Sequence, residues 1–413
     1  MQKTCKNCTQ KFKPTNHHEK FQVPAPTLCY ECRQQRRLAW RNEHKLYKRT
    51  CDLCDKPIIS VHHDKTPFEV YCNECWWSDK WSPPEQEFDF NRSFFDQFHE
   101  LLKKTPRINL SASNNENCDY VNYTNYSKDS YLAIGGHHSE KCFYTWRTHD
   151  SLDCFECAQC NKCSHCLECT DCDNCYELSY GQLCQGCDNS YFLYYCRSCS
   201  DCFLCCNLTH KKHCIFNEQF PPEEYKEKIT SLLQKPLSEL FQIFQNLQLK
   251  HPRKHLNMTN CENSLGNYLV NCQNCTNVHS GKECRDCHNV FMTERANDCV
   301  DCDVVGWPAE LCYEGISTCV HAFNNKFSST CWTCSDVEYC DSCFNSENLF
   351  GCIGLRHNFF CILNKQYEKE EYEELVPKII EHMKKNQEYG EFFPIKISPF
   401  DYEETIAQDY YPR

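Results

Sequence analysis

The sequence contains little glycine and no long apolar run. Only 11 glycines occur among 413 residues, and we find no phosphate-binding loop, dinucleotide fingerprint, nucleophile elbow or HExxH helix. These absences argue against the common enzyme classes, so we expect a non-enzymatic binding protein with no small-molecule substrate. No apolar stretch reaches the roughly eighteen residues of a membrane-spanning helix, so we expect no membrane association.

An export signal is also missing. The first residues, MQKTCKNCTQKFK, are polar and lack the apolar core of a secretory signal. The chain nevertheless has 41 cysteines, an odd number, and many of them recur as CxxC pairs. In a small secreted protein this density would indicate disulfides, whereas these features together favour reduced thiols or thiolate–metal bonds. We therefore expect a cytoplasmic protein.

Four CxxC pairs near the N-terminus have the spacing of two zinc ribbons. The inner gaps between paired CxxC turns are 20 and 17 residues, within the range of four-cysteine zinc sites. Zinc takes four sulfur ligands at about 2.3 Å in a tetrahedron, and each turn supplies two of them, so such a zinc ion is structural. The expected ligands are Cys5, Cys8, Cys29 and Cys32 in the first site, and Cys51, Cys54, Cys72 and Cys75 in the second.

Residues 1–50 are basic although the whole chain is acidic. They contain 12 Lys or Arg and 3 Asp or Glu, whereas the chain has a net charge of −13. Guanidinium groups suit phosphate, which predicts a contact with RNA, DNA, the ribosome or the transcription machinery, while the acidic repeats would present a surface to protein partners. The alternative is a solvated helix, or internal pairing with acidic residues elsewhere. The side chains expected along one side of a helix are Arg33, Arg36, Arg37, Arg41 and Lys45.

From Cys118 onward the sequence repeats with a period of twelve. Cysteines recur in one column, with Ser130 and Ser190 filling gaps, and in places every third residue is cysteine. A second column, one residue later, holds Tyr131, Phe143, Phe155, Leu167, Tyr191 and Phe203. The period suits a narrow β-solenoid with 12 residues per coil, or a wider one with 24. Sides of about two residues joined by corners would point one residue in three inward.

The repeat arrangement recurs 147 residues later, where CILNKQY at 361–367 matches CIFNEQF at 214–220. A helix signal follows each copy, which indicates an internal duplication of two modules capped by helices. The expected fold is mainly β with small α. The expected segments are the basic zinc ribbon 1 (1–50), zinc ribbon 2 (51–80), a helix and linker (81–117), repeat module 1 (118–214), a helical cap (215–254), repeat module 2 (255–361), a second cap (362–390) and a C-terminal tail (391–413).

Three smaller features carry expectations of their own. We expect the apolar helix within 81–107 to pack against the zinc region, and the three tryptophans of WWSDKW at 76–81 to pack a small metal-bound core. The histidine pairs at 17/18, 62/63 and 137/138 are expected in exposed loops. The cysteines of the repeats could be apolar core filler, ligands of further metal ions, or disulfides, and their spacing does not decide among the three.

Several segments closely resemble uncharacterised cysteine-rich zinc-ribbon proteins of candidate-phyla-radiation (Patescibacteria) bacteria. They are PTLCYECRQQRRLAWRNEHKLYKRTCDLC, VYCNECWWSDKW, FDFNRSFFDQFHELLKKTPR and the two module endings. The first ribbon is also similar to the "probable zinc-ribbon" domain. This resemblance implies zinc and a duplication but no activity. We therefore expect a zinc-binding adaptor, with a metal or thiol reservoir that uses the repeat cysteines as the alternative.

Overall fold

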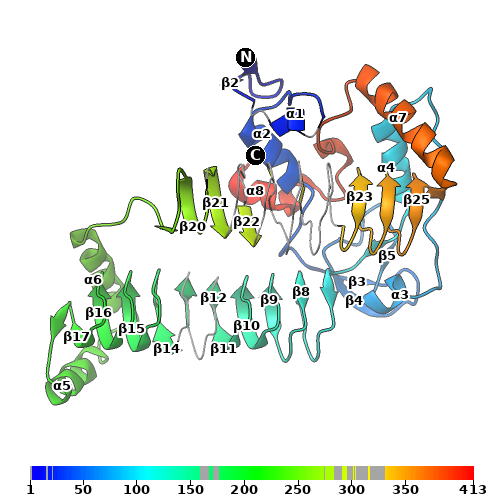
Figure 1. Ribbon diagram of the computed structural model, residues 1–413. Helices are drawn as coiled ribbons and strands as arrows, with labels where there is room; N and C mark the ends of the chain where they lie inside the picture. The colour runs from blue at the N-terminus through cyan, green and yellow to red at the C-terminus, as the bar shows by residue number, and fades with distance from the viewer. Residues whose placement is uncertain are drawn as a thin grey trace. The chain divides into compact units, whose positions relative to one another are not determined.

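The computed structural model describes residues 2–14, 17–20, 22–158, 167–170, 176–273, 275–282, 291–294, 301, 303, 315–316 and 331–413 (Figure 1). It is mainly β, with few helices, and divides into two units. The ribbon unit comprises Met1–Ile58, His62–Ile108 and His255–Arg413, and the first-module unit comprises Ile59–Val61 and Asn109–Lys254. The ribbons thus share a unit with the second repeat module rather than with the first, which follows them in sequence.

The first-module unit is a narrow β-solenoid of parallel strands. Its strands are β7 (Ala112–Ser113), β8 (Thr124–Asn125), β9 (Tyr131–Ile134), β10 (Glu140–Trp146), β11 (Leu152–Phe155), β12 (Cys157–Ala158), β13 (Cys169–Thr170), β14 (Tyr176–Ser179), β15 (Asp188–Tyr194), β16 (Ser200–Cys206) and β17 (Lys212–Ile215), followed by the antiparallel β18 (Glu218–Gln219). Pairing begins at Ala112, opposite Thr124, within the segment that sequence suggested as a linker.

Strand register settles the length of a coil. Cys142 lies opposite Cys154, Tyr191 opposite Phe203, and Cys202 opposite Cys214. Each partner is 12 residues further on, so a coil has 12 residues rather than 24. The columns seen in the sequence are therefore rows of stacked side chains along the solenoid.

A left-handed residue at every third position explains the period of three. Tyr120, Tyr123 and Tyr126 have φ of 55°, 52° and 55°, and each precedes a buried inward residue. Such φ values are uncommon outside glycine. Here the turned backbone is held by bonds between coils, such as Leu132 N–H to the carbonyl of Asp119 at 3.2 Å. The short sides with one inward residue in three, predicted from the sequence, are confirmed.

Cysteine fills the interior because it is small and can donate a hydrogen bond to the coil. The thiol of Cys142 reaches the carbonyl oxygens of Glu140 at 3.6 Å and Ser151 at 3.8 Å. The hydroxyl of Ser139 reaches the equivalent oxygens of His137 and Thr148 at 3.2 and 3.1 Å. Cysteine and serine therefore make the same contacts at inward positions, and no disulfide is assigned to the described repeat cysteines, which is consistent with core filler.

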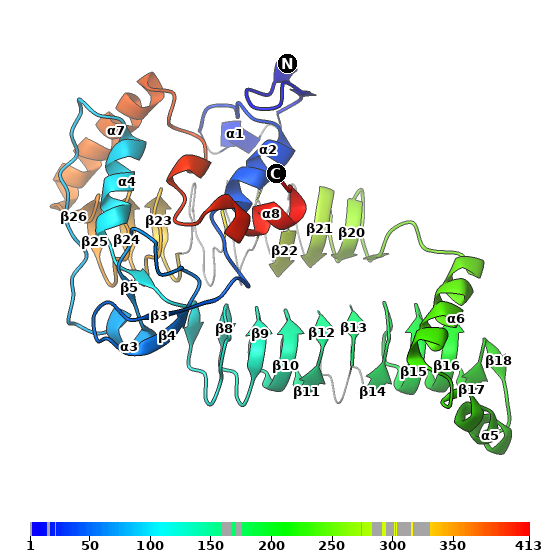
Figure 2. The same cartoon turned by 180° about the vertical axis from the view of Figure 1, so that it is seen from behind.

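Two helices close the first-module unit. α5 (Pro222–Leu232) and α6 (Leu237–Lys250) lie in the segment expected to form a helical cap. Their residues Tyr225, Leu240 and Phe244 share a buried cluster with Phe192 and Phe203 of the last coils. Figure 2 shows α6 against β15 and β16 from behind. The helices thus cover one side of the solenoid near its C-terminal end.

The ribbon unit combines short N-terminal elements, the second module and the tail. Its N-terminal elements are β1 (Lys3–Thr4), β2 (Lys11–Phe12), α1 (His17–Lys20), α2 (Tyr30–Leu38), β3 (Tyr47–Thr50), β4 (Pro57–Ser60), β5 (Val70–Tyr71), α3 (Asn73–Trp76), α4 (Phe94–Lys104) and β6 (Arg107–Ile108). The second module has β19 (Met258–Thr259), β20 (Leu265–Val270), β21 (Thr276–Lys282), β22 (Phe291–Glu294), β23 (Ser335–Glu338), β24 (Glu347–Phe350), β25 (Phe359–Ile362) and β26 (Lys365–Gln366), then α7 (Lys369–Lys385), η1 (Ile395–Ile397), η2 (Tyr402–Glu404) and α8 (Ile406–Tyr410).

The two module endings have the same local structure. The side chain of Asn217 accepts from the N–H of Cys206 at 2.8 Å and donates to its carbonyl at 2.9 Å. Asn364 makes the same pair of bonds to Ile353, at 2.8 and 3.0 Å. This agreement supports the internal duplication read from CIFNEQF and CILNKQY.

The helix expected within 81–107 is α4 (Phe94–Lys104), and it packs on more of the chain than the zinc region. α4 begins after Ser93, whose hydroxyl accepts from the N–H of Asp96, and further upstream the Gln86 N–H bonds the carbonyl of Leu363. Phe94 contacts the rings of Tyr339 and Phe350 of the second module. The helix shares its buried cluster with Val23, Trp40 and Phe68 of the zinc region, as expected, and also with residues of the second module and the C-terminal tail, which the sequence did not indicate. None of the described helices is both long and apolar enough to cross a membrane.

Candidate metal centres

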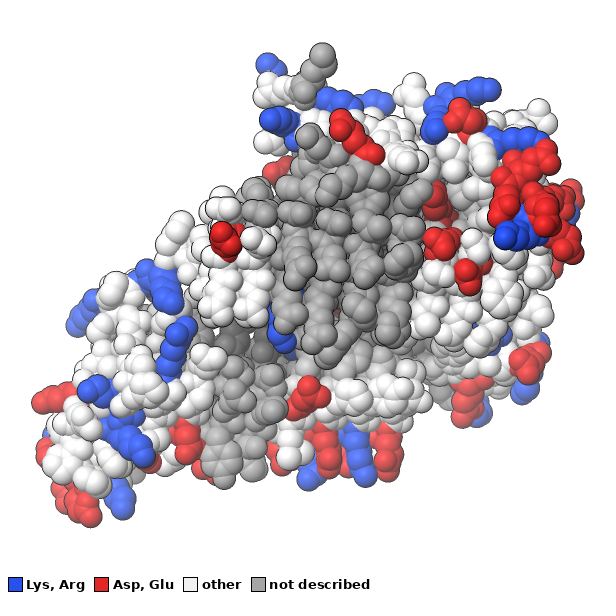
Figure 3. Space-filling model, viewed as in Figure 1, with Lys and Arg blue, Asp and Glu red and all other residues white. Residues whose placement is uncertain are grey.

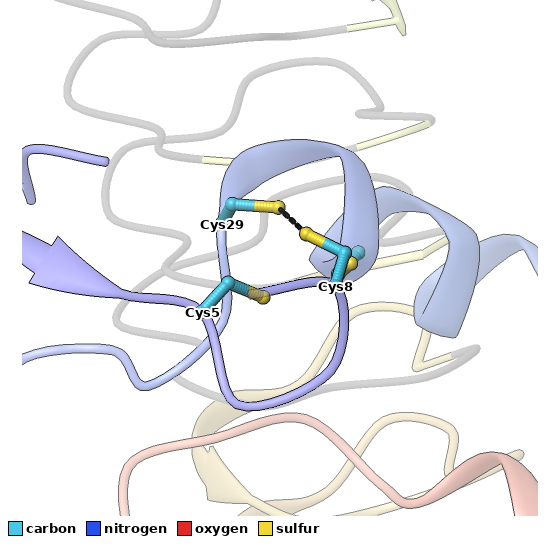
Figure 4. Close-up of side chains that lie close together, drawn as sticks. Cys5, Cys8 and Cys29 are labelled. Atoms are coloured by element: carbon cyan, nitrogen blue, oxygen red, sulfur yellow. Dashed lines mark hydrogen bonds between the residues drawn. The ribbon is translucent and has the colours of Figure 1, made fainter. Parts of the chain in front are cut away.

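The first cysteine tetrad joins a hairpin turn to the start of a helix. Cys5 and Cys8 lie in the turn between β1 and β2, where Cys5 N–H donates to Gln10 and Thr9 has φ of 64°. Cys29 is the N-cap of α2 and Cys32 lies in its first turn. The thiols of Cys5, Cys8 and Cys29 point toward one another (Figure 4), with the sulfurs of Cys8 and Cys29 3.5 Å apart.

The second tetrad repeats this construction. Cys51 and Cys54 lie in the turn between β3 and β4, where Asp55 takes φ of 57°. Cys72 caps α3, and its sulfur accepts from the N–H of Cys75 at 3.4 Å. The sulfurs of Cys54 and Cys72 are 3.9 Å apart. In both tetrads, a turn provides the first pair and a helix start the second, where backbone N–H groups favour thiolate.

The local electrostatics already favour ionisation of one thiol in each tetrad. Burial opposes ionisation of Cys5, but hydrogen bonds from the backbone of Cys8, Cys29 and Asn7 outweigh it and lower its pKa to about 6. Burial of Cys51 is outweighed in the same way by the backbone of Cys72, Leu53 and Cys54, which lowers its pKa to about 7. The pKa of Cys29 is raised, first by burial.

The geometry of both groups fits a tetrahedral metal site. In each, one sulfur from every cysteine lies within 4.8 Å of the others. Four sulfurs at about 2.3 Å from a zinc ion are about 3.8 Å apart. The eight cysteines predicted from CxxC spacing are thus brought together as two groups that could hold a metal ion. Each group offers four sulfur ligands. A tetrahedral ion bound by all four would have no coordination position open for a substrate.

The arginine row after the first ribbon is buried and neutralised inside the ribbon unit. Arg37 is 0% exposed, and its Nε donates to Asp303 at 2.6 Å. Arg33 pairs with Asp301, and Arg36 pairs with Glu391 at 2.7 Å. The guanidinium groups of this row are thus paired inside the chain, which was the alternative interpretation, and the contact with nucleic acid stays a prediction.

The rest of that row lies beyond the helix. α2 ends at Leu38, so Arg41 and Lys45 do not continue its face. Arg41 is buried and pairs with Glu43 at 2.7 Å, and the Lys45 ammonium bonds the carbonyl of Glu403. Over the described residues visible in Figure 3, basic and acidic side chains are intermixed rather than gathered in one basic patch.

The second ribbon is anchored by tryptophan. Trp76 is 1% exposed and its ring lies 5.4 Å from that of Phe344 in the second module. The guanidinium of Arg356 lies 5.4 Å from the Trp76 ring and 5.3 Å from the Trp81 ring. Core packing, the interpretation favoured for WWSDKW, is confirmed for Trp76, whereas Trp77 remains 42% exposed.

Histidine departs from expectation at His62. This side chain is 3% exposed and stacks on Phe400 with ring centroids 4.9 Å apart, so it is not an exposed loop residue. Burial, followed by the charges of Arg107 and Arg49, lowers its pKa well below the usual value. The side chain of His17 lies outside the described residues, and His138 is exposed as predicted.

Sequence reasoning missed one further group of possible ligands. His63, Asp401 and Glu404 come within 4.8 Å of one another. Two of the three already have hydrogen-bond partners, since His63 Nδ1 accepts from Lys65 N–H at 3.0 Å and Glu404 accepts from Tyr47 at 2.6 Å. Asp401 is mostly exposed, so we interpret the group as a surface hydrogen-bond network rather than as a metal site. Neither Asp401 nor Glu404 lies in a motif, so no signal in the sequence could have found the group.

The repeat cysteines do not reproduce the tetrads. Within the described ranges, only the ribbon cysteines gather as groups of three or more thiols within 4.8 Å. Several cysteines of the predicted columns lie outside the described residues: Cys163, Cys166, Cys175, Cys287, Cys299 and Cys319.

No protein-family model matches this chain, and no curated protein matches it either. The resemblance to bacterial zinc-ribbon proteins stays a prediction. What can be said of function therefore rests on the geometry of the two tetrads and of the surfaces around them.

Proposed function

We propose that this protein is a zinc-organised scaffold. Structural zinc in both tetrads fixes the two ribbons, the ribbons brace the second module, and the solenoid surfaces bind protein partners. The observation that carries this proposal is the pair of four-cysteine groups whose sulfurs lie within 4.8 Å of one another.

The ligands of these groups favour a structural zinc ion over a catalytic metal ion. All-sulfur tetrahedral sites select zinc or iron, and a site with four protein ligands has no position for substrate. The first ribbon has little core apart from its cysteines, since the described residues of its cluster are Cys5, Cys29 and Cys32 with Phe12 and Leu28 beside them. Metal binding and local folding are therefore expected to be coupled.

The way in which the ribbons are attached supports a structural role. The first ribbon extends into α2, whose arginines pair with Asp301, Asp303 and Glu391. The second carries Trp76 onto Phe344, and β6 carries Arg107 to a buried pair with Asp341. Zinc that fixes the ribbons would consequently hold the second module in place.

A protein partner is favoured over nucleic acid. The buried arginine row cannot meet a phosphate backbone without leaving its acidic partners, and the chain is acidic overall, with a net charge of −13. A contact with RNA or the ribosome stays a prediction. The reservoir alternative receives no support from the described repeat cysteines, which form no further groups of this kind.

Metal removal from the full chain tests the proposal. We expect chelation under reducing conditions to open both the ribbons and the second module to protease, and zinc to restore protection. Cobalt substitution should give the absorption of tetrahedral thiolate sites. A chelated, metal-free protein with an unchanged digestion pattern would contradict the proposal.

A further inference from the structure

One side of the coils in the first-module unit carries a mainly apolar strip, which is interrupted by Glu156, Glu168 and Ser179. It consists of the residue after an inward position and the left-handed residue that follows, as in Phe143 and Tyr144. The strand register stacks Tyr131, Phe143 and Phe155, and further along it stacks Tyr191, Phe203 and Ile215. The same side of the coil is therefore apolar in both the N-terminal and the C-terminal half of the unit.

The C-terminal half of this strip is covered by helices of the chain itself. Phe192, Phe203 and Leu204 are 2%, 0% and 0% exposed. The ring of Phe241 in α6 lies 5.0 Å from Tyr180 and 5.3 Å from Phe192, so one helix side chain bridges two neighbouring coils. The strip is thus built to receive an amphipathic helix.

The duplicated module uses its own strip in the same way. Tyr339 and Phe350, the counterparts of Phe192 and Phe203, are 0% and 1% exposed. The ring of Phe94 in α4 lies 5.2 Å from Tyr339 and 5.5 Å from Phe350, and α7 adds Ile379 and Met383 to the cluster. Helix docking on this side of the coil therefore occurs twice in one chain.

The N-terminal half of the first-module strip remains exposed. Phe143, Tyr144 and Phe155 are 37%, 50% and 41% exposed. Their rings form an ordered row, with centroids 5.7 Å apart from Tyr131 to Tyr144 and 5.6 Å apart from Tyr144 to Phe155. Contiguous exposed aromatic surface of this kind marks interaction sites.

We propose that this exposed half, the aromatic strip, binds one amphipathic helix of a partner protein. Its residues are Tyr120, Tyr131, Leu132, Phe143, Tyr144 and Phe155. Four coils at about 4.8 Å per step extend roughly 14 Å, enough for one helix of about 10–12 Å diameter. The proposal rests on the scaffold function and names the surface and the kind of partner that the scaffold binds.

The acidic residues beside the aromatic strip indicate which charges the partner helix should carry. Asp119 and Glu156 occupy positions of the strip in its first and fourth coils, and both are exposed. Each therefore places a carboxylate at one end of the aromatic row. The fitting helix has phenylalanine or leucine along one stripe and lysine or arginine at its ends. Segment 235–250 of this chain, KPLSELFQIFQNLQLK, has that composition and already docks on the continuation of the strip.

A labelled peptide of sequence 235–250 is the probe, titrated by fluorescence anisotropy into the zinc-loaded full chain. We expect saturable binding that weakens at least tenfold in the double variant Tyr144→Asp and Phe155→Asp. The matched control is Tyr126→Asp, since Tyr126 is 58% exposed on another side of the same coils; it should bind like wild type. A peptide with serine in place of Phe241 and Phe244 should not bind.

Three results would overturn the proposal: no binding of the peptide, equal binding by the double variant, or self-association of the full chain that the double variant abolishes, which would assign the strip to a second copy. Zinc content is measured on the same samples. A wild-type chain that retains both zinc ions but does not bind the peptide rejects the docking surface alone, whereas absence of zinc from the wild-type chain rejects the scaffold.

Discussion

Replacing Arg37 tests how the first ribbon is held to the rest of its unit. Both Arg37 and Asp303 have fully buried side chains, and Arg37 Nε lies 2.6 Å from the carboxylate. Arg37→Met keeps most of the apolar volume but leaves Asp303 buried without its main partner. Breaking a buried pair in this way costs about 3–5 kcal/mol, and full burial removes the solvent screening that would reduce this figure.

The stability lost in Arg37→Met should depend on pH, and the loss should be larger at high pH than at low pH. Burial raises the pKa of Asp303 to about 6, against the opposing charge of Arg37, so removing Arg37 should raise it further. A carboxyl group with a raised pKa binds its proton more tightly in the folded state than in the unfolded state. The stability of the variant should therefore improve as pH falls from 8 toward 6, and its deficit relative to wild type should shrink.

Urea denaturation of the zinc-loaded full chain at several pH values measures this effect. The double variant Arg37→Met with Asp303→Asn should recover most of the loss, because neither charge then remains buried alone. Lys56→Met is the control, since Lys56 forms an exposed pair with Glu74, and it should leave the midpoint unchanged. If Arg37→Met lowers RNA binding without changing the urea midpoint, the buried pairing is wrong and the arginine row faces a ligand.

Two further predictions concern thiols and histidine. Cys29→Ser should lose the first metal ion. Cys142→Ser should keep both metal ions and lower the free energy of unfolding by only about 1 kcal/mol, because Ser139 already makes the same carbonyl contacts in the same module. Metal analysis and urea midpoints compare the two variants, and equal metal loss would contradict the distinction. His62 has a lowered pKa in the folded state, so the unfolded chain takes up a proton that the folded chain resists, and stability should fall as pH drops below about 6.5. His62→Phe should flatten that part of the pH profile, and an unchanged slope would show that His62 is not the group responsible.

The local repeats of the sequence predicted the solenoid and the tetrads well. Cys142 and Cys154 show the coil length because every inward position has the same small space to fill, and the CxxC turns show the tetrads because each turn places two sulfurs close together. Both signals come from short-range geometry that recurs along the chain.

Long-range docking could not be predicted in this way. The partner of Arg37 is 266 residues away, and Asp303 has no local pattern that distinguishes it from other acidic residues. The amphipathic pattern of α4 indicated that Phe94 would be buried but not by which element, and His62 is buried by Phe400 from the tail. In each case the identity of the covering surface depends on the tertiary fold, about which the segment itself carries no information.

The most direct measurement is zinc-edge X-ray absorption, together with elemental analysis, on the full chain purified under reducing conditions. The account predicts two zinc ions per chain, one for each tetrad, with four sulfur neighbours at about 2.3 Å. A folded chain that binds no zinc, or zinc surrounded mainly by nitrogen and oxygen, would contradict it.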